Sequence, residues 1–549
     1  MQNLLVDIHF LPAGGHYIIS AFPMLCGVDM KARNQSAHKP IKPLFFYFSS
    51  LTGMGGKMKV LIANPPAYIG DHSRHFIQAG SRWSYSMQIK KKSDFKDHYL
   101  PYPFFIGYAS ALLKRDVDAD IKAVDACALD FDDKEFVEYV KRYDPDLLVV
   151  EIPTISFPLM MNVLREIKKT TECKIACAGA HITALTNETM KKYKFIDYAL
   201  LGEYEISLKE LVNVLTTNAT PKNLEQIQGI AFRDNGKVKV NPRRNLLKDL
   251  DILPFPDRDD LNVNHYHDFE IAGRPCVQLL SSRGCPFNCS FCLERQVLYA
   301  SPIYRKRNPV KVVDEMEYVA EKYNAKQIYF DDQTMTVSKE HVTAICMEIL
   351  SRNLDLPWAC MGDITLDFKT LELMKKAGCV GIKFGIETIC PETLKRAGKG
   401  FVNLQKAKLF REWCKKLGIW THATYTIGLP GDTEEKVKAT LKFALELDTD
   451  SAQFSIATPF PGTPFFETAK KEGWLLTLDW TKYDGNVSSV LTYPSLSKEK
   501  IEELFHSLGK SWQIHIIKRY LLNPFRLMKR AKLLGLKNLF KGLRYSYLG

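Results

Sequence analysis

The sequence lacks any apolar run long enough to cross a bilayer. A membrane-spanning helix needs about 20 consecutive, predominantly apolar residues, and no window of the chain meets that requirement. The opening residues, MQNLLVDIHFLPAGG, lack the basic stretch that begins a secretory signal. These two absences argue against an integral membrane protein and against export, and we expect a cytoplasmic protein.

A paired set of cysteines is also missing. The chain has 13 cysteines, an odd number at irregular spacings, which is not the pattern of a disulfide framework. With 549 residues, of which 46% are hydrophobic, the chain has enough apolar material for two or more cores. The thiols are therefore expected to be reduced, with metal binding open to some of them.

Acidic residues are absent from the C-terminal end. Between Lys510 and Gly549 the chain has ten Lys and Arg and no Asp or Glu, so removing this stretch lowers the net charge from +13 to about +3. The rest of the chain does not indicate a basic nucleic-acid-binding surface, and we expect no nucleic-acid partner. The stretch interleaves its charges with Leu, Ile, Phe, Trp and Tyr, which suits an interfacial helix on anionic lipid. The alternatives are a tail that packs on the protein and, with less support, RNA contact.

Residues 1–57 fit nothing that follows. They have no clear periodicity and carry Gly- and Pro-rich punctuation, whereas a buried strand is expected to begin at Met58. We interpret them as a leader, either a disordered segment or the product of a mis-set start, with Met58 as the true initiator.

Residues 58–218 alternate short apolar runs with amphipathic segments. This alternation predicts a parallel sheet covered by helices on both faces, as in a Rossmann-like α/β domain. Residues 219–275 are expected to form a hairpin that turns at Asp234-Asn235-Gly236 and a linker, for which the Pro- and Asp-rich stretch 253–260 is the best candidate. The strands are expected at 58–66, 121–127, 145–154, 173–180 and 196–203.

Residues 276–470 contain a second alternating series. Six strand–helix steps over this length predict a partial (β/α)6 barrel, whose active site would lie at the C-terminal ends of the strands. Residues 471–549 follow as a helical extension. The six strands are expected at 276–282, 327–332, 357–364, 381–387, 420–428 and 452–460.

A three-cysteine motif directly follows the first strand of this second series. Cys285, Cys289 and Cys292 have the spacing C-x3-C-x2-C in SSRGCPFNCSFCLE. Three thiolates on one short loop suit three irons of a 4Fe–4S cubane, and the missing fourth cysteine leaves one iron open to a small molecule. A zinc knuckle is the alternative, but zinc usually takes four close ligands and no His or Cys follows within the next dozen residues.

With the aromatic Phe291 before its last cysteine, the motif resembles that of the radical SAM superfamily. The likeness continues at later strand ends, where the family contacts S-adenosylmethionine (SAM). It implies that Asp331 and Asp332 hold the amino group of SAM, that Glu387 contacts its ribose, and that Gly428 lies near its adenine. Carboxylates that cap the next helix, and glycines that only form turns, are the alternatives. The sixth strand ends in PFPGTP (459–464), as in the branch that includes the methylthiotransferases.

The resemblance implies a particular chemistry. The open iron would chelate SAM, and one electron from the reduced cluster would break a C–S bond to give a 5′-deoxyadenosyl radical. An external electron donor such as flavodoxin or ferredoxin would be required. The protein would orient the cofactors and exclude water.

Residues 58–218 resemble the cobalamin-binding domain that precedes the radical SAM barrel in one large branch of the superfamily. The likeness rests on IANPP, AGAH and LGEYE after the first, fourth and fifth strands. Gly179 and Gly202 lie at C-terminal strand ends, where an open α/β sheet binds ligands, and glycine lets the backbone approach a bulky macrocycle. A scaffold that has lost its cofactor is the alternative.

The chain departs from that pattern in having no D-x-H-x-x-G run, which supplies a histidine ligand to cobalamin. His72 and His75 have the wrong spacing, and His181 is interpreted as a capping or loop residue rather than a ligand. We therefore expect cobalamin without a histidine ligand. Cys173 and Cys177 share the C-x3-C spacing but lie along an expected strand, so we interpret them, and the remaining thiols of the second series, as buried packing residues.

The leading hypothesis is a cobalamin-dependent radical SAM enzyme that methylates an unactivated carbon of a small-molecule or lipid substrate, with a second SAM methylating the cobalamin. The alternatives are an anaerobic cyclase or rearrangement enzyme of tetrapyrrole or lipid metabolism and, from a different class, a non-catalytic corrinoid or Fe–S carrier. A tRNA methylthiotransferase is disfavoured because no second three-cysteine cluster lies upstream. The basic end adds the hypothesis of peripheral contact with the membrane.

Overall fold

The computed structural model describes residues 56–66, 68–69, 74–79, 83–88, 100–217, 219–266 and 268–522. The chain divides after Gly55 into two units, and everything below concerns the second, Gly56–Gly549. The expected leader therefore lies almost wholly outside the described residues. So do the last residues of the basic end, from 523 onward, and His72.

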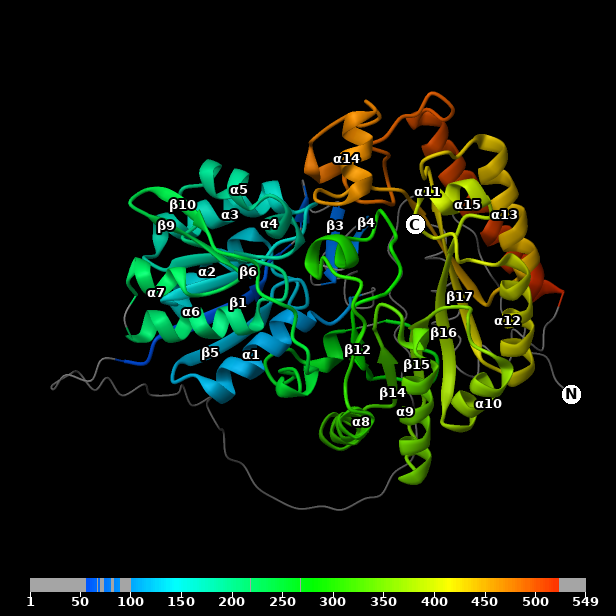
Figure 1. Ribbon diagram of the computed structural model, residues 1–549, viewed down its shortest axis with the longest axis horizontal. Helices are drawn as coiled ribbons and strands as arrows, with labels where there is room; N and C mark the ends of the chain where they lie inside the picture. Colours follow the sequence, from blue (N-terminus) through cyan, green and yellow to red (C-terminus); the bar gives the residue numbers. More distant parts are fainter. Residues whose placement is uncertain are drawn as a thin grey trace, which may run out of the picture. The chain divides into compact units, whose positions relative to one another are not determined.

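The first sheet has seven strands in the order β10-β9-β8-β7-β6-β1-β5 (Figure 1). Strands β1, β5, β6, β7 and β8 are parallel, and the expected Rossmann-like sheet is confirmed. Buried apolar residues run almost continuously along them, as both faces of a covered parallel sheet require. The strands span Lys59–Asn64 (β1), Asp120–Asp125 (β5), Leu147–Glu151 (β6), Lys174–Ala178 (β7), Tyr198–Leu200 (β8), Ile230–Asp234 (β9) and Lys237–Val240 (β10).

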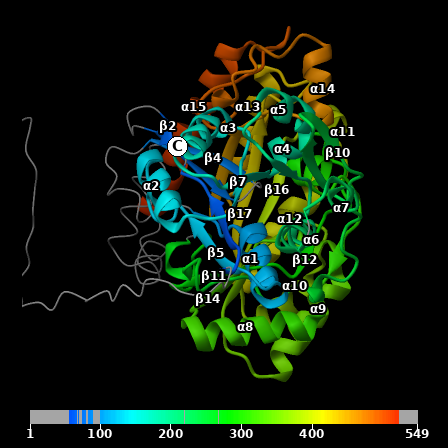
Figure 2. The same ribbon diagram turned by 90° about the vertical axis from the view of Figure 1, so that its left-hand side faces the viewer.

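Helices cover both faces of this sheet and create two separate apolar cores. Helix α1 packs against α6 on one face (Figure 2), while α2 and α3 pack together on the other. Side-chain caps begin two of these helices: Asp132 forms a reciprocal capping box with Glu135 at α2, and Thr220 accepts from the Asn223 N–H at α7. The helices span Phe104–Asp116 (α1), Asp133–Tyr143 (α2), Phe157–Thr170 (α3), Ala180–Ala184 (α4), Thr186–Lys192 (α5), Glu205–Thr217 (α6) and Pro221–Glu225 (α7).

Two features near this sheet differ from the expectations. The hairpin β9–β10 does turn at 234–236, but it extends the first sheet, because β9 pairs antiparallel with β8. A small antiparallel sheet of Tyr68–Ile69 (β2), Arg74–Ala79 (β3) and Trp83–Gln88 (β4) was not predicted. Strand β3 (RHFIQA) shows no clear alternation of polar and apolar residues, whereas β4 (WSYSMQ) does alternate, and that signal was overlooked.

The second sheet contains six parallel strands in sequential order, with β11 and β18 at its two ends. This order is that of a partial (β/α)6 barrel, and the prediction is confirmed. The sheet is visible in Figure 1 as long strands with helices along their outer side. The strands span Cys276–Leu279 (β11), Gln327–Phe330 (β14), Trp358–Gly362 (β15), Cys379–Glu387 (β16), Trp420–Ile427 (β17) and Ser451–Ile456 (β18).

The outer helices pack in sequence order, α8 on α9, α9 on α10, α10 on α12 and α12 on α13. Alternate residues of each strand face them and form one large apolar core. The other side of the sheet carries more polar residues, including Lys383 and His422. The helices span Pro309–Tyr323 (α8), Lys339–Ser351 (α9), Phe368–Lys376 (α10), Pro391–Arg396 (α11), Leu404–Leu417 (α12), Glu434–Leu447 (α13) and Pro464–Lys471 (α14).

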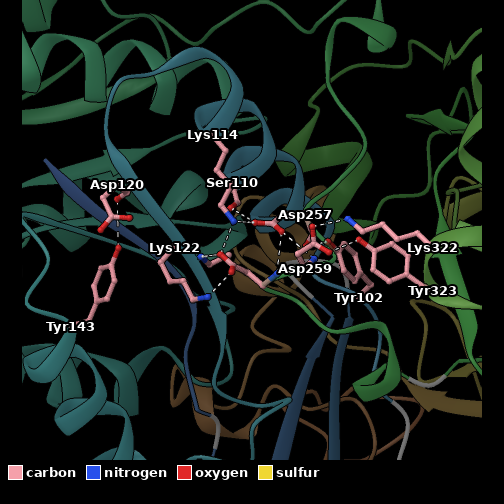
Figure 3. Close-up of polar contacts among 12 residues, drawn as sticks. Tyr102, Ser110, Lys114, Asp120, Lys122, Tyr143, Asp257, Asp259, Lys322 and Tyr323 are labelled. Carbon is pink, nitrogen blue, oxygen red and sulfur yellow. Dashed lines mark hydrogen bonds and ion pairs between the residues drawn. The ribbon is translucent and has the colours of Figure 1, made fainter. Parts of the chain in front are cut away.

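The stretch 253–260, expected to be a linker, is attached to the first sheet and its helix α1 by two aspartates, the first of which is labelled in Figure 3. Asp257 accepts hydrogen bonds from Ser110 and Lys114 of α1, each at 2.6 Å. Asp260 lies 2.8 Å from Lys114 and 2.5 Å from Lys122 of β5. Both aspartates therefore bind the first sheet and its helix.

The two residues between those aspartates bind the barrel instead. Arg258 is fully buried and lies 2.8 Å from Glu315 of α8. Asp259 accepts hydrogen bonds from Lys322 at 2.8 Å and Tyr323 at 2.9 Å, at the end of the same helix (Figure 3). The stretch that connects the two sheets is thus an ordered brace, held by side-chain contacts on both sides.

The C-terminal extension contains helix α15, Lys498–Leu521, which packs against α13 and β18. Trp512, Ile516 and Tyr520 are buried in the barrel core, and Arg519 lies 2.8 Å from Asp448. The start of the basic end therefore packs on the protein, which was the alternative to the interfacial helix. No helix among the described residues is both long enough and apolar enough to span a membrane.

Candidate active site

The cysteine motif lies at the C-terminal edge of the barrel sheet, in the loop between Ser282–Arg283 (β12) and the π-helical turn Glu294–Leu298 (η4). Cys285, Cys289 and Cys292 are all partly exposed. Burial of the thiols raises their pKa values, to about 12, 11 and 12. Ionised thiolates would therefore need a strong positive partner at neutral pH, which a metal supplies.

Residues from three other strand ends fix the backbone of this loop. Gln333, after β14, accepts a hydrogen bond from the Gly284 N–H at 2.7 Å. The Ser290 N–H donates to the Ala397 carbonyl at 2.9 Å, and the Ser290 carbonyl accepts from the Phe465 N–H at 3.2 Å. The loop is consequently positioned by segments that are distant from it in the sequence.

Two glycines make the close packing around the loop feasible. Gly284 has a φ of +91°, and a Cβ there would overlap the Ile303 carbonyl. Gly398 has a φ of +73°, and a Cβ would overlap the Asn288 carbonyl and approach the Cys289 Cα at 3.3 Å. Both positions require glycine for its conformation as well as for its size.

Three soft thiolate donors on one loop are the donor set that an iron–sulfur cluster takes. Among the described residues, no three His, Cys, Asp or Glu side chains are arranged to hold one metal ion. The three cysteines of a cubane each bind a different iron, so they need not converge on one point. The interpretation of Cys285, Cys289 and Cys292 as ligands of such a cluster stays a prediction.

Asp331 and Asp332 follow β14 at the same edge and are both buried. The Asp332 carboxylate accepts hydrogen bonds from the Ser281 N–H at 2.7 Å, the Ser281 hydroxyl at 2.6 Å and the Ser282 hydroxyl at 2.5 Å. It therefore ties β14 to the segment that leads into the cysteines, and it does not cap the next helix, α9, whose N-cap is Ser338. A direct contact of either aspartate with SAM stays a prediction.

Glu387 ends β16 with a φ of +66°, in the left-handed region that residues other than glycine rarely adopt. Its carboxylate accepts hydrogen bonds from Lys399 at 2.6 Å and from the Thr426 hydroxyl at 2.7 Å. Sequence reasoning missed Lys399, although its setting between two glycines, Gly398-Lys399-Gly400, was a visible signal. The carboxylate predicted to contact ribose is thus already paired with a buried cation.

Gly428 follows β17 with a φ of +80°. Its N–H donates to Asp432 at 3.0 Å, and its carbonyl accepts from the Tyr493 hydroxyl at 2.7 Å. Burial raises the pKa of Asp432 to about 6, against hydrogen bonds from the Leu429 and Gly428 N–H groups that lower it. Gly428 is needed for this turn, and its contact with adenine stays a prediction.

The other cysteines mostly behave as expected. Burial raises the pKa values of the fully buried thiols, which serve as packing groups. Cys390 differs, because it is partly exposed and its pKa is lowered: hydrogen bonds from Thr393 and from backbone N–H groups outweigh the effect of burial. The buried thiols of the sheets and their helices include Cys173, Cys177, Cys276, Cys346, Cys360, Cys379 and Cys414.

The C-terminal ends of the parallel strands in the first sheet form a second candidate binding site, the ligand edge of that sheet. Strand β1 pairs with β5 on one side and β6 on the other, so the strand order reverses between β1 and β6, where open α/β sheets bind ligands. Gly179, after β7, has φ 105° and ψ 177°, a conformation open essentially to glycine alone. Gly202, after β8, has a φ of +66° and packs closely on Arg243 and the Leu298 carbonyl. Gly202 thus accommodates a close internal contact, and its approach to a macrocycle stays a prediction.

Three polar side-chain atoms at this edge are buried and have no hydrogen-bond partner among the described residues: Asn64 Oδ1, Thr154 Oγ1 and His181 Nδ1. They follow or end β1, β6 and β7, respectively. Unsatisfied buried polar atoms are rare in native proteins, so a polar ligand at this edge would account for all three. The edge therefore fits a large ligand rich in amide groups, such as cobalamin.

His181 is buried within α4, and its ring stacks on Phe157 at 4.0 Å and meets Trp480 edge-on at 5.3 Å. Helix α4 has no side-chain cap hydrogen bond, so the interpretation of His181 as a capping residue is wrong. Burial lowers its pKa to about 3, which keeps the ring neutral across the physiological range.

Buried ion pairs join the two edges. Arg283, two residues before the first cysteine, lies 3.1 Å from Glu203 and 2.8 Å from Glu205, which follow β8. Arg305 also pairs with Glu203, at 2.7 Å. All four side chains are at most 5% exposed. The loop that carries the cysteines is thus attached directly to the ligand edge of the first sheet.

An α/β domain of the cobalamin-binding type, followed by a six-stranded partial barrel with three cysteines at its ligand edge, defines the class of radical SAM enzymes with an N-terminal corrinoid domain. Comparison with known sequences agrees. The radical SAM superfamily matches residues 279–444, and the B12 binding domain matches residues 102–212.

Curated relatives establish the family. The uncharacterized methyltransferase PH0819 of Pyrococcus horikoshii is 32% identical over 404 residues, covering 73% of this chain and 85% of that protein. The anaerobic magnesium-protoporphyrin IX monomethyl ester cyclase of Cereibacter sphaeroides is 25% identical, covering 70% of this chain and 62% of that protein. The chain belongs to the family of radical SAM enzymes that carry a B12-binding domain.

The solved structures agree on the fold. The radical SAM methyltransferase TsrM of Kitasatospora setae aligns with a TM-score of 0.59 at 19% identity, covering 77% of this chain and 79% of that one. The cofactors of the family are the three that the sequence predicted, a 4Fe–4S cluster, SAM and cobalamin. The chain is thus a radical SAM enzyme.

Proposed function

We propose that this protein transfers a methyl group to an unactivated carbon of a small-molecule substrate. The observation that carries the proposal is the set of buried ion pairs from Arg283 to Glu203 and Glu205. A radical generated at one cofactor has to be quenched by a methyl group held at the other, so both cofactors must lie beside one substrate. A rigid connection between the two ligand edges meets that requirement.

When bound, the cluster with SAM supplies a carbon-centred radical and the corrinoid carries the methyl group. The residues of this chain then have three tasks. Cys285, Cys289 and Cys292 would bind the cluster, with Asp332 fixing the segment that precedes them. The buried polar atoms of Asn64 and His181 would contact the corrinoid without charge.

Two alternatives remain distinct from this proposal. The similarity to the cyclases favours an anaerobic ring closure or rearrangement, and cyclases and methyltransferases share this architecture. A non-catalytic corrinoid or Fe–S carrier would need no site for SAM. Methyl transfer is preferred because PH0819, at 32% identity, and the cytidylyl-2-hydroxyethylphosphonate methyltransferase of Streptomyces wedmorensis, at 26%, carry that name.

Product analysis distinguishes the methyltransferase, the cyclase and the carrier hypotheses. Anaerobically reconstituted protein, loaded with cobalamin and reduced, is incubated with SAM and candidate substrates. Methyl transfer predicts both 5′-deoxyadenosine and S-adenosylhomocysteine, because one SAM supplies the radical and a second supplies the methyl group. Formation of 5′-deoxyadenosine alone would favour the cyclase, and neither product would favour the carrier. An external one-electron donor such as flavodoxin or ferredoxin should replace the chemical reductant.

The membrane hypothesis has a narrower physical basis than the sequence suggested. Trp512 and its neighbours pack into the barrel, but the outward face of α15 exposes Ile514 and Ile517, which are 53% and 38% exposed, beside Lys510 and Lys518. An apolar strip flanked by lysines suits the surface of an anionic bilayer. A lipid or lipid-bound substrate would be consistent with this contact.

Sedimentation with vesicles tests this part. We expect the protein to bind anionic but not neutral vesicles at low salt, and added salt to weaken binding. An Ile514→Ser, Ile517→Ser double variant should reduce binding without loss of SAM cleavage, because neither side chain is buried in the core. Equal sedimentation of the variant would contradict the role of α15, and a truncation after Leu522 would then test the rest of the basic end.

A further inference from the structure

Lys399 is a buried lysine at the ligand edge of the barrel, in the segment that follows α11. It is only 9% exposed. Burial disfavours its charged form, but Glu387 and the neighbouring cysteines outweigh that effect, so its pKa is raised and the side chain stays protonated. Lysine is rarely buried unless it is paired, because removing an ammonium group from water is unfavourable.

Polar contacts fix the position of this ammonium group. Its Nζ atom lies 2.6 Å from Glu387 Oε1 and 3.0 Å from the Gly385 carbonyl. The second carboxylate oxygen of Glu387 accepts from Thr426 at 2.7 Å. Lys399 is therefore held against the ends of β16 and β17 rather than free to move.

The backbone around Lys399 is packed directly on the cysteine loop. The Ala397 carbonyl accepts a hydrogen bond from Ser290, which lies between two of the cysteines. Gly398 lies so close to Asn288 and Cys289 that a side chain would not fit. The lysine is thus anchored to the same loop that would carry the cluster.

Lys399 is joined to the cysteine loop more directly than Glu387 is. The two residues before it make the contacts with Asn288, Cys289 and Ser290, whereas the carboxylate of Glu387 binds Lys399 and Thr426. A fixed ammonium group is therefore attached to the loop, and its removal would leave the carboxylate of Glu387 unbalanced beside it.

We propose that Lys399 is a positioning residue that raises the reduction potential of the cluster, with Glu387 holding it in place. This inference rests on the proposed cluster ligands. The step concerned is the uptake of one electron from an external one-electron reductant, which makes the cluster more negative. A nearby fixed cation stabilises the reduced form, because net charge around an iron–sulfur cluster sets its potential and a buried site screens the interaction weakly.

The test is a redox titration of the reconstituted, SAM-free protein, in which the reduced cluster is followed by electron paramagnetic resonance. Leaving SAM out removes any contribution from contact of Lys399 with SAM. For Lys399→Met we expect the ratio of reduced to oxidised cluster at a fixed potential to fall about tenfold, which for a one-electron couple is about 59 mV. Lys399→Arg, which keeps the charge, should stay near the wild type.

Lys395→Met is the matched control. It removes the same charge from the exposed side of α11, where water and salt screen it, and should leave the potential unchanged. Glu387→Gln keeps the lysine but removes its counter-charge, so the potential should rise.

An unchanged potential in Lys399→Met with full iron content would overturn the inference. If that variant does not take up iron, Glu387→Gln decides, and an unchanged potential there would overturn it as well. Absence of iron in the wild-type protein would instead contradict the cluster assignment. If Lys399→Met shows the expected fall in potential but the wild-type protein forms no methylated product, this inference stands and methyl transfer is contradicted.

Discussion

The two ligand edges of the protein differ in how the titratable groups beside their inferred ligands are held. At the barrel edge the charged side chains near the cysteines are engaged, Asp332 with two serines and Glu387 with Lys399. At the edge of the first sheet, burial raises the pKa of Asp125 to about 6 and lowers that of His181 to about 3, which favours their neutral forms, and the charged Glu203 is paired with Arg283 and Arg305.

The difference matches the ligands that each edge is inferred to bind. SAM carries a sulfonium, an ammonium and a carboxylate, and the cluster changes charge during the reaction, so fixed counter-charges are useful there. A corrinoid is a large ligand surrounded by neutral amides, which hydrogen-bond to neutral partners without the desolvation of an ion. The four predictions below test this comparison, in order of decreasing effect.

Loss of any one cluster cysteine is expected to have the largest effect. Wild-type protein reconstituted without oxygen should bind about four irons per chain and cleave SAM when reduced. Alanine at Cys285, Cys289 or Cys292 should abolish both properties, as measured by iron analysis and 5′-deoxyadenosine formation. Cys390→Ala, at a partly exposed thiol outside the motif, is the control and should retain both. If all three motif variants still cleaved SAM, the assignment of a cluster to the barrel edge would be contradicted.

The next largest effect is expected from breaking the buried ion pairs that link the two edges. Arg283→Met leaves the buried Glu205 without its cation, and removing one partner of a buried pair costs about 3–5 kcal/mol of unfolding free energy. Denaturant unfolding of the full chain measures the change. Lys169→Ala, in the exposed pair with Glu166, should cost less than about 0.5 kcal/mol. A loss below about 1 kcal/mol in Arg283→Met would mean that the two edges are not joined as the geometry indicates.

His181 should make stability depend on pH. Its folded pKa, about 3, lies below the ordinary value of 6.5, so between these values the unfolded chain binds more protons and stability falls as the pH falls. Between pH 7.5 and pH 5 the residue should account for a loss of about 2 kcal/mol. His181→Phe should remove that part of the dependence, as measured by unfolding at both pH values. An identical dependence in the variant would show that the ring is not buried as a neutral base.

Asp125 should produce a smaller effect of opposite sign. Its folded pKa, about 6, lies above the ordinary 3.8, so the folded chain binds more protons in between and stability rises as the pH falls. From pH 7.5 to pH 5 the gain should be about 1.4 kcal/mol, and Asp125→Asn should lack it. Asparagine keeps the shape and can still accept from Asn64. If Asp125→Asn showed the same gain in stability, Asp125 would not be the group responsible for it.

Local pattern was sufficient to predict both sheets. The apolar runs at 58–66 and 327–332 became buried parallel strands because a strand covered on both faces is a short, nearly continuous apolar run, which the sequence displays directly. The place of the cysteine motif after the first barrel strand could be predicted for the same reason. The three-stranded sheet β2–β4 was missed, although the residues of β4, WSYSMQ, alternate in polarity.

The contacts within the site could not be predicted in that way. Lys399 meets Glu387, 12 residues earlier, and Arg283 meets Glu203, 80 residues earlier, so each pair depends on the finished fold. A lysine in a sequence is almost always a surface residue, so nothing in the sequence singled out Lys399 as buried. His181 was misread because burial depends on Phe157 and Trp480, the second of which lies at the far end of the chain.

The brace at 257–260 has a consequence for how the protein moves. Its four consecutive residues bind the two sheets in the order first, barrel, barrel, first, so rotation about this connection would have to break contacts on both sides together. Motions that need many contacts to break at once are rare and slow compared with rearrangement of a surface loop. If substrate has to enter and product has to leave, the loops at the strand ends are the parts that would open, and the spacing between the two cofactors would stay constant through the catalytic cycle.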